Sequence, residues 1–256
     1  MPTAIKLQAE FGDALQVIFV ESQGAKPDQA ERFALERKWM GTRAMWTSER
    51  PFSTGTGGLP SLVLLDQDGV VLESGLNSRI GGAVEDHIEA FLKDRKKFPK
   101  DRPKALKKAW TYAQKGKLAD AVAELAELEA EGDEAAAAAT TMRQELERKV
   151  DARFTAITWM LDNGYPLEGA DALETLAGQV DEHEAWTARA TELTERLEGE
   201  AMETELDAAK ALAKLVEKLY ADGPDEKLAK KLTKLAEQHA GTKVAARATH
   251  LATLAG

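Results

Sequence analysis

The amino-acid pattern changes near Pro99 and Pro103. Before this point, short runs rich in Val, Ile and Leu alternate with segments of helical periodicity. After it, the chain is rich in Ala, Leu, Glu and Lys, which favour helices, and no strand pattern remains. Because 256 residues are enough for two ordinary domains, we predict an α/β domain over residues 1–98, a linker over 99–104 and an all-α domain over 105–256.

The helical half contains a weak repeat around three glycines, Gly116, Gly164 and Gly223. Small or apolar residues recur at fixed offsets after each glycine, and this pattern predicts helical hairpins with tight turns at the glycines. The stretch AWTYAQKGKLADAVAELAELEAE resembles a tetratricopeptide repeat. That resemblance implies a platform for binding partner proteins. The unequal spacing of the glycines leaves an irregular helical bundle with a leucine core as the alternative.

The first half predicts a small mixed sheet with helices on its faces. Strands are expected for LQVIFVES and RAMW, and helices for TAIKLQAEFGDAL, KPDQAERFALERKWM and GAVEDHIEAFLKD. The runs SLVLL and VVLES flank the turn sequence Asp66-Gln67-Asp68-Gly69, so we expect a β-hairpin there.

The string LPSLVLLDQDG and the order of these elements resemble the thioredoxin-like superfamily, in its thiol–disulfide interchange and peroxiredoxin-like branch. The resemblance implies a cis peptide bond between Leu59 and Pro60, directly before the hairpin. An X-Pro bond adopts the cis form at much lower energy than other peptide bonds. The resemblance also implies that Leu59 and Pro60 bind an extended substrate peptide through backbone hydrogen bonds. The parent function would be thiol–disulfide oxidoreduction in cell redox homeostasis.

The chain departs from that family because it contains no cysteine. Its opening, MPTAIKLQAEFGD, resembles the middle of the family's first active-site helix. We therefore expect the preceding strand and the CxxC motif to lie upstream of Met1, or to have been lost, which leaves the thioredoxin-like domain incomplete. Thiol exchange requires a thiolate, so we expect no catalytic residue and no redox activity in this chain. The alternative is a non-enzymatic protein–protein interaction or scaffold protein.

Composition and motifs argue against several other functions. A net charge of −10 is unfavourable for sequence-independent binding of nucleic acid, and the basic stretch 93–108 has the composition of a solvated linker. No apolar run reaches the length of a membrane span. Without a phosphate loop, a zinc motif or a complete calcium loop, we expect no cofactor and no metal. The expected partner is a protein or an extended peptide. The expected location is cytoplasmic, or exported or periplasmic if a signal peptide precedes Met1.

Overall fold

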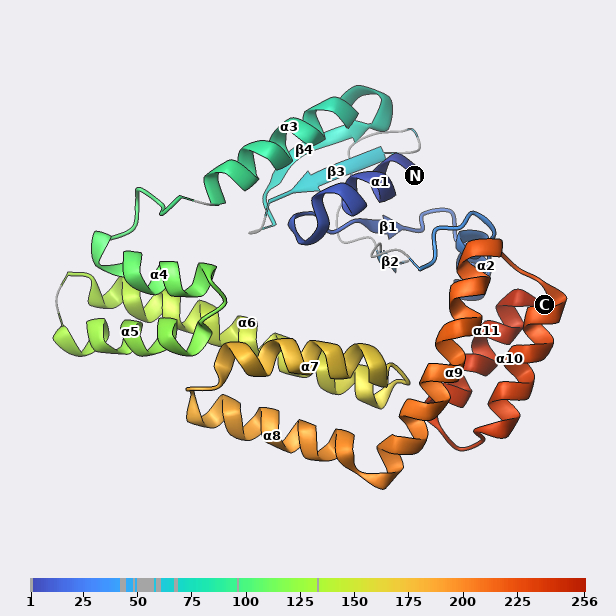
Figure 1. Ribbon diagram of the computed structural model, residues 1–256. Coiled ribbons are helices and arrows are strands. Elements are labelled where there is room, and N and C mark those ends of the chain that lie inside the picture. Colours follow the sequence, from blue (N-terminus) through green and yellow to red (C-terminus); the bar gives the residue numbers. More distant parts are fainter. Residues whose placement is uncertain are drawn as a thin grey trace. The chain divides into compact units, whose positions relative to one another are not determined.

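The computed structural model describes residues 2–41, 45–47, 49, 58, 61–66, 69–95, 97–132 and 134–256. The chain is mostly helical with two small sheets, and the expected helical part is present (Figure 1). It divides into two compact units. The first comprises Met1–Lys97 with Leu219–Pro224, and the second comprises Phe98–Lys218 with Asp225–Gly256.

The first unit has the order of helices and strands that the sequence predicted. Its elements are α1 (Pro2–Phe11), the short 3-10 helix η1 (Gly12–Ala14), β1 (Ile18–Val20), α2 (Pro27–Glu36), β2 (Met45–Thr47), β3 (Ser61–Leu65), β4 (Val71–Leu76) and α3 (Asn77–Arg95).

The described strands form two separate two-stranded sheets, not the single mixed sheet that we expected. β1 and β2 are parallel, with Ile18 opposite Met45, whereas β3 and β4 are antiparallel, with Ser61 opposite Leu76. The described residues supply no further strand that would join the two pairs. Two-stranded sheets are only marginally stable alone, and the packing of α3 on β3 and β4 contributes to the stability of that pair.

The predicted β-hairpin of β3 and β4 is confirmed, and Gln67 and Asp68 of its turn lie outside the described residues. The backbone N–H of Val70 donates to Asp66 Oδ1 at 2.8 Å, and the N–H of Asp66 donates to the carbonyl of Val70 at 2.9 Å. Gly69 has a φ of 81°, which glycine adopts without a steric penalty. An Asp side chain that bonds nearby backbone in this way explains why the sequence signal was reliable.

The described residues of the second unit form helices joined by turns and loops, with no strand, as predicted. Its elements are the 3-10 helix η2 (Lys104–Leu106), α4 (Lys107–Gln114), α5 (Leu118–Glu131), α6 (Ala136–Asp162), α7 (Pro166–Val180), α8 (Glu184–Glu198), α9 (Glu200–Asp222), α10 (Glu226–Gln238) and α11 (Lys243–Ala255), where the last residues of α9 belong to the first unit.

The three predicted glycine turns are present. Gly116, Gly164 and Gly223 have φ values of 75°, 80° and 93°, and each lies between two helices. The first two join the packed pairs α4–α5 and α6–α7. The most closely packed pair at the C-terminus is α10–α11, which is joined around Gly241. The third hairpin is therefore displaced by one helix from the predicted position.

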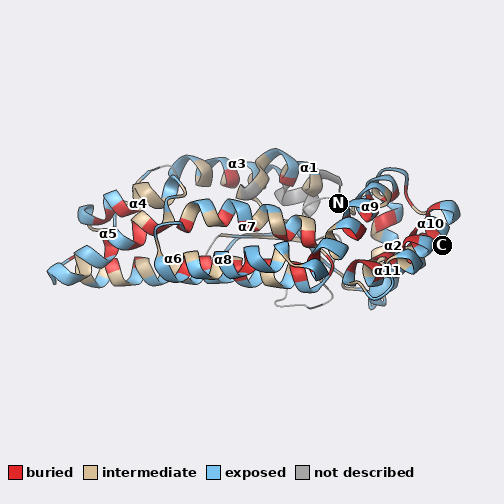
Figure 2. Ribbon diagram, turned by 60° about the horizontal axis from the view of Figure 1, so that its bottom comes forward, coloured by how far each residue is buried: buried red, intermediate tan, exposed pale blue. Residues whose placement is uncertain are grey.

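The core of the second unit follows α6, which contributes to two hydrophobic clusters. Figure 2 shows buried positions recurring along α6, α7 and α8. One cluster joins Phe154 and Ile157 of α6 to Leu176 of α7 and Trp186 of α8. The other lies between α4, α5 and the start of α6. Burial of such apolar side chains is the main stabilising term for a helical stack.

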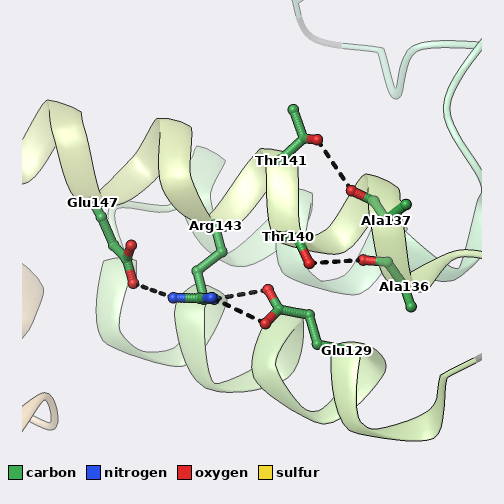
Figure 3. A network of polar contacts seen from close by, with 7 residues as sticks. All are labelled: Glu129, Ala136, Ala137, Thr140, Thr141, Arg143 and Glu147. Carbon is green, nitrogen blue, oxygen red and sulfur yellow. Dashed lines mark hydrogen bonds and ion pairs between the residues drawn. The ribbon is translucent and has the colours of Figure 1, made fainter.

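A network of ion pairs joins α5 to α6 (Figure 3). Arg143 of α6 donates to both carboxylate oxygens of Glu129 on α5 and to Glu147 on its own helix. Thr140 donates to the carbonyl of Ala136. The guanidinium of Arg143 is thus satisfied by two carboxylates, and this network is structural.

Candidate partner-binding groove

Leu59 and Pro60, the two residues predicted to bind a substrate peptide, lie outside the described residues. The peptide bond and the site predicted there stay predictions. A different feature, in the second unit, is a candidate for binding among the described residues.

An open groove of about 410 Å³ runs along α8. Figure 1 shows α7 and α8 side by side, and both helices contribute to it. α7 and the residues after it supply Ala177 and Asp181. The remaining lining residues come from α8 at helical spacing: Thr187, Ala190, Thr191, Thr194, Glu195 and Glu198. Residues three and four positions apart lie on one side of a helix, so these six form a continuous stripe.

α8 presents this stripe because a neighbouring stripe is buried. Trp186, Ala190 and Leu193 are buried in the core that α8 shares with α6 and α7. The start of α8 is fixed by His183, whose ring nitrogen Nδ1 accepts the N–H of Trp186 at 3.4 Å and whose ring stacks on the indole at a centroid distance of 3.9 Å. Packing and capping therefore set the rotation of α8, with buried Ala190 at the edge between the core and the groove and the threonines and glutamates of the stripe left uncovered.

The charges of α8 are segregated between its two sides. Arg189 and Arg196 point toward α6, where they pair with Asp151 at 3.1 Å and with Asp162 at 2.6 Å. The groove side carries Glu195 and Glu198, and Asp181 lies across from them. None of these three carboxylates has an ion-pair partner within the described parts of the chain. The groove consequently offers unpaired negative charge.

Two of the three threonines of the groove, Thr187 and Thr194, offer hydrogen-bond acceptors. The hydroxyl of Thr187 donates to the carbonyls of Val180 and Asp181, at 3.2 and 2.9 Å. The hydroxyl of Thr194 donates to the carbonyl of Ala190 at 2.9 Å. Because a hydroxyl has one donor, both oxygens have only acceptor capacity left for a ligand.

This set of side chains is suited to binding. The lining contains no histidine, lysine or cysteine, and the hydroxyl protons of Thr187 and Thr194 are donated to backbone carbonyls and not to a base. No group of three or more potential metal-ligating side chains occurs among the residues that the structure describes. Sequence reasoning missed the groove. Its signal was the stripe of Thr, Ala and Glu over residues 187–198, which is ambiguous until the packing of α8 is known.

Comparison with protein-family models, with curated proteins and with solved structures finds no match. A separate observation concerns membranes: in the described portion of the chain, no helix combines the length and the hydropathy needed to cross a bilayer. Because the comparisons find no match, the chemistry of the described side chains is the basis for the proposed function.

Proposed function

We propose that this chain is a non-catalytic scaffold that binds a partner protein through its helical unit. The observation that supports the proposal is the uncovered groove along α8, where small side chains, threonine oxygens and unpaired carboxylates lie together. Stacks of helical hairpins commonly bind partners on such surfaces. The small side chains and carboxylates of the groove are suited to binding a protein segment.

The proposal keeps the kinship with thioredoxin-like proteins for the first unit. The order of helices and strands there, with the hairpin β3–β4 before α3, supports that kinship. Without cysteine, this unit acts as a binding or structural module.

Position-specific crosslinking tests the proposal. A photoreactive phenylalanine derivative replaces Thr194 in the groove of the full chain, expressed in the cells that make the protein. The control places the same group at Glu192, an exposed residue of α8 that does not line the groove. We expect a discrete protein adduct from position 194 and none from position 192. Equal adducts at both positions, or no adduct at 194, would contradict the proposal.

A further inference from the structure

We infer that the segment bound in the α8 groove is a helix of another protein that carries lysine or arginine side chains. This inference rests on the proposed function and names the chemistry of the partner. Three properties of the groove support it, namely its charge, its hydrogen-bonding capacity and its shape.

The charge of the groove selects a cation. α8 directs its arginines to α6 and its glutamates Glu195 and Glu198 to the groove. An acidic partner would therefore meet like charge with no neighbouring lysine or arginine in the lining. A basic partner supplies the counter-charges, and such complementarity governs both the rate and the specificity of association.

Most hydrogen-bonding groups of the groove are acceptors, and the hydroxyl of Thr191 is the exception among its threonines. Thr187 and Thr194 have used their hydroxyl protons on backbone carbonyls, and ionised carboxylates only accept. Lysine carries three N–H donors and arginine five, and neither has an acceptor. These two side chains match the groove better than asparagine, serine or an acidic residue.

The shape of the groove favours a helix as the occupant. The stripe from Thr187 to Glu198 covers about three turns of α8, or ~16 Å along the axis. Five of the eight lining residues of the groove are alanine or threonine, and small side chains permit the close axial approach, about 8 Å, of tightly packed helices. An amphipathic helix in a groove is a recurring mode of peptide recognition.

Binding of designed peptides to the full chain tests the inference. The probe is a fluorescent 14-residue helical peptide with alanine on one face and lysine on both flanks. We compare it with a glutamate-for-lysine version and with a version of equal charge that contains a central proline. Fluorescence anisotropy should show saturable binding of the lysine helix, and no saturable binding of the glutamate version or the proline version. Equal binding of the proline version would overturn the helical occupant.

Variants of the groove locate the binding. We expect Glu195→Gln and Glu198→Gln each to weaken binding about twofold to fivefold, the range for exposed ion pairs. The matched control is the double variant Glu174→Gln with Glu192→Gln. It changes the net charge as much as the double groove variant, at exposed positions outside the lining. Equal weakening by this control would show that the peptide responds only to overall charge, and would overturn the inference.

Two further results separate this inference from the proposed function. A discrete adduct at position 194 together with no binding of the lysine helix refutes the basic helix and leaves the scaffold function standing. If neither the adduct at position 194 nor binding of the lysine helix is observed, both the basic helix and the scaffold function are refuted. A peptide of residues 93–108 that binds the groove as tightly as the lysine helix would assign the occupant to a second copy of this chain, and would also overturn the inference.

Discussion

Arg143 of α6 and Glu129 of α5 form a two-point ion pair across their hairpin, with Nε–Oε1 at 2.7 Å and Nη2–Oε2 at 3.0 Å (Figure 3). Both side chains are less than a third exposed. The hydrogen bonds from Arg143 hold the pKa of Glu129 below its ordinary value near 4.5, although partial burial opposes the shift. A planar guanidinium matches a carboxylate at two points, which fixes the geometry as well as the charge.

The first prediction is that Glu129→Gln destabilises the chain by about 1 kcal/mol at neutral pH. The native pKa of Glu129 is lowered, so its contribution is fully present above the unfolded pKa and is lost as the pH falls through the native pKa. The difference between wild type and variant should therefore shrink in acid. Urea unfolding between pH 7 and pH 3 measures it, with the exposed Glu131→Gln as control. A difference that stays constant down to pH 3 would refute the assignment.

The second prediction concerns the turn between α6 and α7. Gly164 has a φ of 80°, and a Cβ added there would lie 2.8 Å from the carbonyl oxygen of Lys243. Gly164→Ala should cost about 1–3 kcal/mol of stability, because it combines an unfavourable φ with a backbone clash. The control is Gly178→Ala in α7, where the added methyl meets nothing within 4 Å and alanine favours the helix. If thermal unfolding gives the same midpoint temperature for Gly164→Ala and Gly178→Ala, the close approach of Gly164 to Lys243 is contradicted.

The third prediction concerns Arg153 of α6, whose Nη1 donates to Gln179 Oε1 of α7 at 2.5 Å. Burial lowers the pKa of this guanidinium, because a low-dielectric environment disfavours the charged form. Gln179→Ala removes its acceptor and should destabilise the chain by about 1–3 kcal/mol. Arg153→Met should be milder, since it also removes the partly buried charge. Chemical unfolding in which Arg153→Met is the more damaging change would refute this explanation.

The fourth prediction concerns thiol chemistry. The purified chain should reduce insulin disulfides with dithiothreitol no faster than buffer does, because exchange proceeds by thiolate attack and the chain has no cysteine. A dithiol thioredoxin in the same assay is the positive control. A measurable rate from this chain would remove the chemical basis of the non-catalytic assignment.

Local signals explain what the sequence predicted correctly. The turn from Asp66 to Val70 and the breaks at Gly116 and Gly164 depend on residues close together in the chain, and each is where the pattern placed it. The division of the strands into two sheets depends on packing between distant segments. The pairing of α10 with α11 is local, around Gly241, but the repeat pattern placed the third hairpin at Gly223.

The groove could not be predicted from the sequence, because it also depends on packing between distant segments. Its negative charge depends on Arg189 and Arg196 finding partners 38 and 34 residues away on α6. Helical periodicity predicts which residues share a side of α8, but not which side the core covers. The predicted site at Leu59 and Pro60 lies outside the described residues and stays a prediction.

Amide hydrogen exchange of the full chain with its crosslinked partner added tests the central claim most directly. The partner recovered from the adduct at position 194 is purified and mixed with the unmodified chain. Binding in the groove should slow exchange at residues 177–198, which include the lining of the groove, and leave α10 and α11 unchanged. Slowed exchange in α10–α11 or in the first unit, with residues 177–198 unaffected, would contradict the account.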